Sequence, residues 1–179
     1  MLVDVLTALN SGPLYLDDMR QALSNISDSF SYGSQNRISQ LFTPKIDKVV
    51  FAATKADQIV ATDHLSLVQL LSSLVEQAYE TAEFEGVRPE ILAVAGVRSS
   101  IEVDHDGETG LSGFDTAGND IGYVHPPIPT FIPKNTQHQF FPGWEMPKFN
   151  PPTPPDENEA VPHIRIDSVL KILIGDKCS

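Results

Sequence analysis

Two continuous apolar runs, at residues 49–53 and 91–95, most constrain what this chain can fold into. Apolar runs of this length between polar residues are typical of strands that are covered on both faces, as in a parallel sheet. Between them, apolar residues recur with a helical period at positions 67, 71, 74, 75, 78 and 82. These features predict a strand, a helix and a second strand, the basic unit of an α/β fold.

The segment before these runs repeats the pattern. Residues 2–6 form an apolar run that is broken only by Asp4, and apolar residues follow at helical spacing at positions 16, 19, 23, 26 and 30. Thr62 and Asp63 are candidate caps for the later helix, and Gly86 stands where that helix should stop. The full order β-α-β-α-β predicts right-handed crossovers and a three-stranded parallel sheet.

The remaining sequence divides into three further parts after an α/β unit at residues 1–99. Short alternating segments separated by polar turn residues predict a β-rich insertion at residues 100–125. All fourteen prolines except Pro13, Pro44 and Pro89 lie between residues 126 and 162, which predicts an extended proline-rich arm there. Residues 163–179 hold a C-terminal amphipathic helix, which Asp167 could cap and Gly175 could end.

Charge and cysteine content exclude several classes of protein. The formal net charge of −12 disfavours binding to nucleic acid or to an anionic membrane surface, because like charges repel. The single cysteine, Cys178, cannot form an internal disulfide, which fits a reducing compartment. The first residues lack a secretory signal, and no uncharged apolar run reaches the roughly 20 residues of a membrane span. We therefore expect a soluble cytoplasmic protein.

A four-residue motif directly after the run at 49–53 predicts guanine recognition. Thr54, Lys55 and Asp57 match the pattern [N/T]-K-x-D. A carboxylate at the fourth position can accept hydrogen bonds from both N1–H and the 2-amino group of guanine, whereas adenine offers an acceptor at N1 and has no 2-amino group. The Lys55 stem would cover the base, and the Thr54 hydroxyl would tie the loop to its neighbours. About one chain of this length in twenty contains the motif by chance, and the alternative is a Lys–Asp pair that opens a solvated loop.

Ala95 and Gly96, at the end of the third predicted strand, are candidates for a second contact with the base. In guanine-nucleotide folds a turn of small residues here points a backbone N–H at guanine O6, and bulky side chains would block that approach. The alternative is an ordinary strand end whose glycine provides conformational freedom. In an open parallel sheet both segments would lie at the carboxyl ends of the strands, where ligands bind.

Other residues are weaker candidates. Asp4 could hold a magnesium-bound water, but the predicted topology favours a polar residue at a strand end instead. His64, beside Asp63, has the position of a capping neighbour rather than of a catalytic base. Trp144, with three phenylalanines among the prolines, could form a partner-binding strip or simply anchor the arm to the domain. The three phenylalanines are Phe140, Phe141 and Phe149.

The phosphate-binding half of a nucleotide site has no counterpart in this sequence. No G-x-x-x-x-G-K-[S/T] motif occurs in the 179 residues. That loop supplies the backbone N–H groups and the lysine that hold the β- and γ-phosphates.

Five segments together resemble the YcjX-like family of bacterial, Ras-like P-loop GTP-binding proteins. They are residues 2–13, 30–33, 45–57, 162–167 and 173–177. The resemblance implies binding of GTP or GDP with Mg²⁺, slow GTP hydrolysis and a link to stress responses. It also implies that this chain matches the C-terminal part of the family only. Thr54, Lys55 and Asp57 match the guanine-reading motif, and Ala95 and Gly96 lie where the second base contact belongs.

The resemblance also predicts how the sheet would be completed. In the Ras-like strand order 2-3-1-4-5-6, the three predicted strands would be contiguous, and residues 2–6 would form a bare edge for the missing strand of an N-terminal P-loop half. An exposed apolar edge promotes association, so the isolated chain should be marginally stable. The leading function is the guanine-recognition half of a P-loop GTPase. The alternative is a non-enzymatic interaction domain that uses the proline-aromatic arm.

Overall fold

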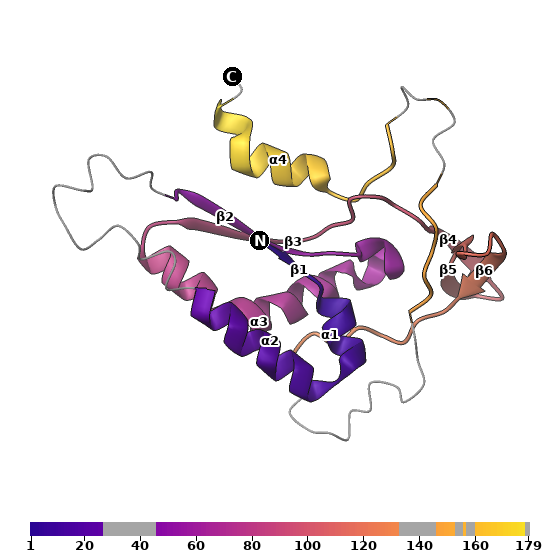
Figure 1. Cartoon of the computed structure of the whole chain (residues 1–179), viewed down its shortest axis with the longest axis horizontal. Helices are drawn as coiled ribbons and strands as arrows, with labels where there is room; N and C mark the ends of the chain where they lie inside the picture. Colours follow the sequence, from indigo (N-terminus) through magenta and orange to yellow (C-terminus); the bar gives the residue numbers. More distant parts are fainter. Residues whose placement is uncertain (27–45, 133–145, 153–155, 157–159, 178–179) are drawn as a thin grey trace.

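The computed structural model describes residues 1–26, 46–132, 146–152, 156 and 160–177 (Figure 1). Its main sheet has three parallel strands in the order β1-β2-β3, which confirms the α/β class and the predicted parallel pairing. The strands are β1 (Leu2–Val3), β2 (Lys48–Ala53) and β3 (Arg88–Ala93). The central strand β2 pairs with both neighbours, and the carboxyl ends of all three strands lie at the same edge of the sheet.

The first predicted strand is shorter than expected and is followed by an additional helix. β1 ends at Val3, and the rest of the apolar run enters helix α1 (Val5–Ser11), whose N-cap is Asp4. The Asp4 carboxylate accepts a hydrogen bond from the Thr7 N–H at 3.1 Å, as a capping side chain does. The prediction of a strand over residues 2–6 was therefore wrong, because a five-residue apolar run fits a buried helical turn as well as a strand.

The two apolar stripes form helices α2 (Pro13–Ile26) and α3 (His64–Phe84), as predicted, and the structure shows that these helices pack side by side. α2 begins at Pro13, a favoured first position of a helix. α3 follows two short 3₁₀ turns, η3 (Ala56–Gln58) and η4 (Ala61–Asp63). The predicted end of the α2 stripe, Phe30, lies outside the described residues.

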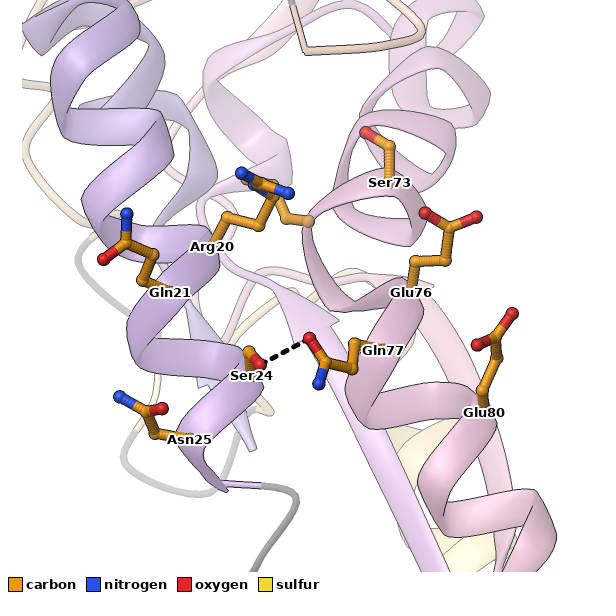
Figure 2. A pocket seen from close by; sticks show the side chains of 9 residues that line it. Arg20, Gln21, Ser24, Asn25, Ser73, Glu76, Gln77 and Glu80 are labelled. Atoms are coloured by element: carbon orange, nitrogen blue, oxygen red, sulfur yellow. Dashed lines mark hydrogen bonds between the residues drawn. The ribbon is translucent and has the colours of Figure 1, made fainter.

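A polar groove with a volume of about 440 Å³ lies between α2 and α3 (Figure 2). The Ser24 hydroxyl donates a hydrogen bond to Oε1 of Gln77 across it at 2.6 Å. The groove is lined by helix residues only, so it lies apart from the loops that follow the strands.

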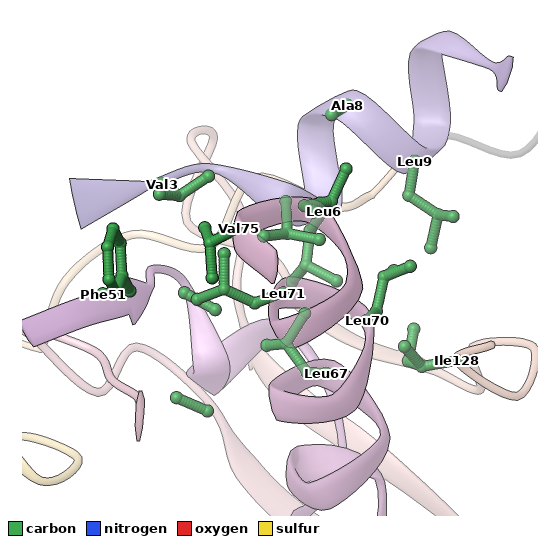
Figure 3. Packing of buried hydrophobic residues seen from close by; sticks show 14 of the residues in the cluster. Val3, Leu6, Ala8, Leu9, Phe51, Leu67, Leu70, Leu71, Val75 and Ile128 are labelled. Carbon is green, nitrogen blue, oxygen red and sulfur yellow. The ribbon is translucent and has the colours of Figure 1, made fainter. Parts of the chain in front are cut away.

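The core lies between the sheet and helices α1, α2 and α3 (Figure 3). Phe51 on β2 and Leu71 on α3 are both fully buried there. The α3 residues of the predicted stripe are all buried: Leu67, Leu71, Leu74, Val75, Ala78 and Ala82. Because alternate residues of a strand face opposite sides, Val50 and Ala52 face the other side of the sheet.

Helix α4 (Ile166–Ile174) covers that other side, which confirms the predicted C-terminal helix. Its Val169 and Ile172 pack against the second apolar cluster. The chain continues past α4 into a short 3₁₀ turn, η5 (Gly175–Lys177), where Asp176 forms an ion pair with Lys48 at 2.6 Å. Gly175 is the C-cap of α4, as predicted, and it also begins the 3₁₀ turn.

The predicted β-rich insertion is a second, antiparallel sheet in the order β4-β5-β6. It consists of β4 (Ile101–His105), β5 (Glu108–Phe114) and β6 (Asp120–Tyr123). Asp106 and Gly107, both at positive φ, form the two-residue turn between β4 and β5.

One aromatic side chain of the proline-rich arm packs on this second sheet. The Phe149 ring lies over Gly113 and is 6.3 Å from the Tyr123 ring, centroid to centroid. The Asn150 N–H, next in the chain, donates to the Phe114 carbonyl at 2.7 Å. Phe149 thus acts as an anchor of the arm, whereas Trp144, Phe140 and Phe141 lie outside the described residues. In the part of the chain that the structure describes, no helix has both the length and the apolar character needed to cross a membrane.

Truncation of a buried side chain of α3 should destabilise the fold, whereas truncation of an exposed side chain of the same helix should not. Leu71→Ala removes a fully buried side chain and should lower the free energy of unfolding by about 2–5 kcal/mol. The control Leu65→Ala, on the same helix but 65% exposed, should change it by less than about 0.5 kcal/mol. Urea denaturation of both variants measures the difference, and equal effects would contradict this description of the core.

Candidate functional site

The candidate site lies where the carboxyl ends of the three parallel strands meet. The Thr54 N–H donates to the Val3 carbonyl at 2.9 Å, which joins the end of β2 to the end of β1. The Ala56 N–H donates to the Val94 carbonyl at 3.0 Å, which joins the same loop to the end of β3. The predicted motif and the predicted strand end are therefore adjacent in space.

Thr54 and Lys55 connect the motif to the beginning of α1. The Thr54 hydroxyl lies 3.4 Å from the Val3 carbonyl. Lys55 has a left-handed backbone (φ 63°), and its ammonium lies 2.6 Å from Oδ2 of Asp4 and 3.1 Å from the Thr7 hydroxyl. Burial acts to raise the pKa of Asp4, but hydrogen bonds from Lys55 and Thr7 outweigh it, so the pKa lies below its usual value.

The Asp4 carboxylate is already engaged by neighbouring residues of this chain. Its two carboxylate oxygens accept hydrogen bonds from Thr7 and pair with the Lys55 ammonium, so a cation already neutralises this carboxylate. Among the described residues, no group of three or more metal-ligating side chains comes together. The structure therefore favours the interpretation of Asp4 as a polar residue at a strand end, where it also caps α1.

Asp57 is buried, with 9% of its surface exposed, and lines a cavity of about 330 Å³. Its Oδ2 accepts a hydrogen bond from the Ser99 N–H at 3.1 Å. Within the described part of the chain its Oδ1 has no hydrogen-bond partner. Since each carboxylate oxygen has two lone pairs, the side chain can still accept further hydrogen bonds.

Ala95 and Gly96 differ in what they can offer a ligand. The Ala95 N–H already donates to the Ile164 carbonyl at 3.1 Å, and the Ile164 N–H donates back at 2.9 Å. Gly96 is exposed and makes no hydrogen bond with any described residue. A Cβ at Gly96 would meet nothing within 4 Å, so its surroundings are open. If a backbone donor reaches a base here, Gly96 can supply it without breaking a bond.

His64 has a more specific position than a capping neighbour. It is 8% exposed, and its Nε2 donates to the Ala56 carbonyl at 2.9 Å, within the predicted motif. Its Nδ1 then accepts from Arg165 at 3.1 Å, which places the neutral ring between the motif and the segment before α4. Burial first, and the nearby Arg165 charge after it, lower the pKa of His64. The sequence carried no signal for the Arg165 contact, which spans 101 positions.

The fold and the positions of these residues define a class of protein. It is a parallel α/β protein with candidate ligand-reading residues at the carboxyl ends of its strands, the place where open sheets of this class bind ligands.

The family follows from comparison with known sequences. The YcjX-like family, DUF463, matches residues 1–178, so the chain belongs to that family, as the sequence resemblance predicted. It is 38% identical over 184 residues to the Ras-like GTPase YcjX of Escherichia coli (strain K12), covering 99% of this chain and 39% of the relative. It is 30% identical over 189 residues to the Ras-like GTPase YcjX of Shewanella oneidensis, covering 99% and 38%. The chain thus spans about two fifths of the length of these relatives.

Acidification should destabilise the chain through His64. Because the folded-state pKa lies below the ordinary value of 6.5, the unfolded chain binds more protons than the folded chain below that pH. The contribution of His64 is fully present above pH 6.5 and is lost as the pH falls from there toward the folded-state pKa. His64→Gln should therefore flatten the dependence of unfolding free energy on pH.

Urea denaturation between about pH 7.5 and pH 5.5, on either side of the ordinary imidazole pKa, measures this dependence. The matched control is His163→Gln, which makes the same exchange at an exposed position. A slope in His64→Gln equal to that of the unmodified chain would contradict the assignment.

Proposed function

We propose that this chain supplies the guanine-recognition part of a Ras-like P-loop GTP-binding protein. The single observation that carries the proposal is the placement of Asp57, buried at the top of the central strand with acceptor capacity left on its carboxylate. Membership of the YcjX-like family and the names of the two GTPase relatives support it.

Asp57 would set the identity of the base. Its carboxylate would accept hydrogen bonds from N1–H and the 2-amino group of guanine while Oδ2 keeps the Ser99 N–H. The Ser99 bond fixes the direction of the carboxylate, so little side-chain freedom would be lost on binding. Gly96 would donate its backbone N–H to guanine O6, since the Ala95 N–H is engaged by Ile164.

Lys55 would cover the face of the base with its aliphatic stem. The ammonium is held by Asp4 and Thr7 at the start of α1, on the side of the loop toward β1. This ion pair restrains a side chain that otherwise has many rotamers. Asp4 would therefore serve the site through Lys55 and not through a metal ion.

Phosphate binding, Mg²⁺ binding and hydrolysis would depend on the part of the longer relatives that this chain does not match. β1 is an edge strand of two residues, and the first of them, Leu2, is 74% exposed. We infer that a strand from an N-terminal P-loop half pairs along this edge and completes the sheet. Such pairing would cover Leu2 and bring a phosphate loop to the carboxyl end of the sheet.

Replacing the Asp57 carboxylate with an amide should change the preferred base from guanine to xanthine. In Asp57→Asn, the amide oxygen can still accept a hydrogen bond from N1–H. The amide NH₂ would face the 2-amino group of guanine, and both groups are donors. In xanthine the same NH₂ would face the 2-oxygen, which can accept its hydrogen bond. Guanine nucleotide affinity should fall by about 10- to 100-fold, the cost of an unpaired buried polar group, and xanthosine diphosphate should bind better than guanosine diphosphate.

Displacement of a fluorescent guanosine diphosphate from a full-length YcjX-like protein that carries this chain measures both affinities. The matched control is Asp47→Asn, because Asp47 precedes β2 at the opposite end of the strand. Unchanged base preference in Asp57→Asn would refute the assignment of Asp57.

The isolated 179-residue chain should be marginally stable because the β1 edge is open. It should melt at a lower temperature, and over a broader range, than the full-length protein that carries it, and it should associate as its concentration rises. Differential scanning calorimetry at two chain concentrations tests this. A sharp, concentration-independent melt that matches the full-length protein would contradict the inferred strand pairing.

A further inference from the structure

The loop that follows β2 is held by side chains of the antiparallel sheet. Two of its carbonyl groups accept hydrogen bonds from that sheet. The Ser100 hydroxyl donates to the Asp57 carbonyl, and the Tyr123 hydroxyl donates to the Gln58 carbonyl at 2.9 Å. Burial raises the pKa of the Tyr123 phenol, which keeps the hydroxyl protonated and therefore able to donate.

Two backbone N–H groups of the same loop donate to the sheet in return. The Val60 N–H donates to Nε2 of His125 at 2.8 Å, and the Ala61 N–H donates to the Glu102 carboxylate. Nδ1 of His125 lies 2.9 Å from the carbonyl of Pro126, which fixes the tautomer that carries its proton on Nδ1. His125 is 7% exposed, so water does not readily replace it.

These four contacts hold a segment whose own backbone hydrogen bonds are limited to the two short 3₁₀ turns η3 and η4. Buried backbone groups must find partners, and here the partners come from both ends of the insertion. Ser100 directly precedes β4 and Glu102 lies within it, whereas Tyr123 ends β6 and His125 follows it by two residues. The loop is therefore held by contacts from two sides, one from the segment at the start of β4 and one from the segment at the end of β6. Neither segment alone could make both sets of contacts.

We propose that the antiparallel sheet is the positioning element of the guanine-reading loop, with Tyr123 and His125 as its positioning residues. The proposal rests on the guanine-recognition function assigned to Asp57. The backbone of Asp57 is held by Ser100 and its carboxylate by Ser99, the two residues that lead into β4, so a shift of the sheet would change the direction of that carboxylate. Loss of a positioning residue should therefore reduce selectivity for guanine, and not only the stability of the fold.

Three substitutions separate positioning from simple anchoring. His125→Leu removes the acceptor for the Val60 N–H, whereas His125→Gln offers a side-chain oxygen near the place of Nε2. Tyr123→Phe removes only the hydroxyl that bonds the Gln58 carbonyl. The matched control is Thr109→Val, because the Thr109 hydroxyl bonds Asp104 on the exposed part of the same sheet at 2.9 Å and does not contact the loop.

Amide hydrogen–deuterium exchange of the 179-residue chain gives the first readout, which needs no nucleotide. Exchange at Val60 and Ala61 should be at least tenfold faster in His125→Leu than in the unmodified chain. It should return toward the original rate in His125→Gln and be unchanged in Thr109→Val. Equal exchange in His125→Leu and the unmodified chain would overturn the proposal.

Nucleotide affinity gives the second readout, in a full-length YcjX-like protein that carries the chain. His125→Leu and Tyr123→Phe should each lower the ratio of guanosine to adenosine diphosphate affinity about tenfold, with His125→Gln restoring it. An unchanged ratio, despite faster exchange, would overturn the positioning role. If the unmodified protein binds no guanine nucleotide, the proposed function fails, and the exchange readout alone then decides whether the sheet positions the loop.

Discussion

The rest of the structure depends on how the largely buried backbone of residues 56–60 finds its hydrogen-bond partners. This segment leaves the central strand and enters the interior without a ladder of its own. The Ala56 N–H bonds the end of β3, and four of the backbone groups that follow bond side chains more than 40 positions away. Because each unpaired group would carry a desolvation penalty, these distant segments and the loop can adopt their positions only together. The candidate site is therefore a product of the whole fold and not of the four-residue motif.

The local elements of the fold could be predicted from the sequence because their signals are local. The helical stripe from Leu67 to Ala82 has a consistent period, and the run that became β2 is continuous. The run at residues 2–6 is short and interrupted by Asp4, and it was assigned to a single strand although only Leu2 and Val3 form β1 and its last two residues begin α1. The capping residue, Asp4, was visible in the sequence, but it was interpreted as part of a strand. β3 began three residues earlier than expected because an edge strand tolerates Pro89.

The candidate site was predictable to the extent that parallel strands bring their carboxyl ends together. That rule placed Thr54 to Asp57 beside the end of β3, as the structure has them. It could not predict that Lys55 pairs with Asp4, since the pairing depends on the extra helix. Nor could it predict that the Ala95 N–H donates to the Ile164 carbonyl, because an isolated bridge between residues 69 positions apart produces no periodic pattern in the sequence. The roles of these residues toward guanine remain predictions.

The two edges of the parallel sheet differ in whether another strand can pair with them. On the outer side of β3, Pro89 has no N–H to offer, and further along the strand Ile164 forms a bridge to Ala95. The Arg165 guanidinium also bonds the Ala93 carbonyl at that end. β1 has no comparable cover among the described residues. An incoming strand, whether from the same polypeptide or from a neighbouring molecule, could therefore pair with the β1 edge of the sheet but not with the β3 edge.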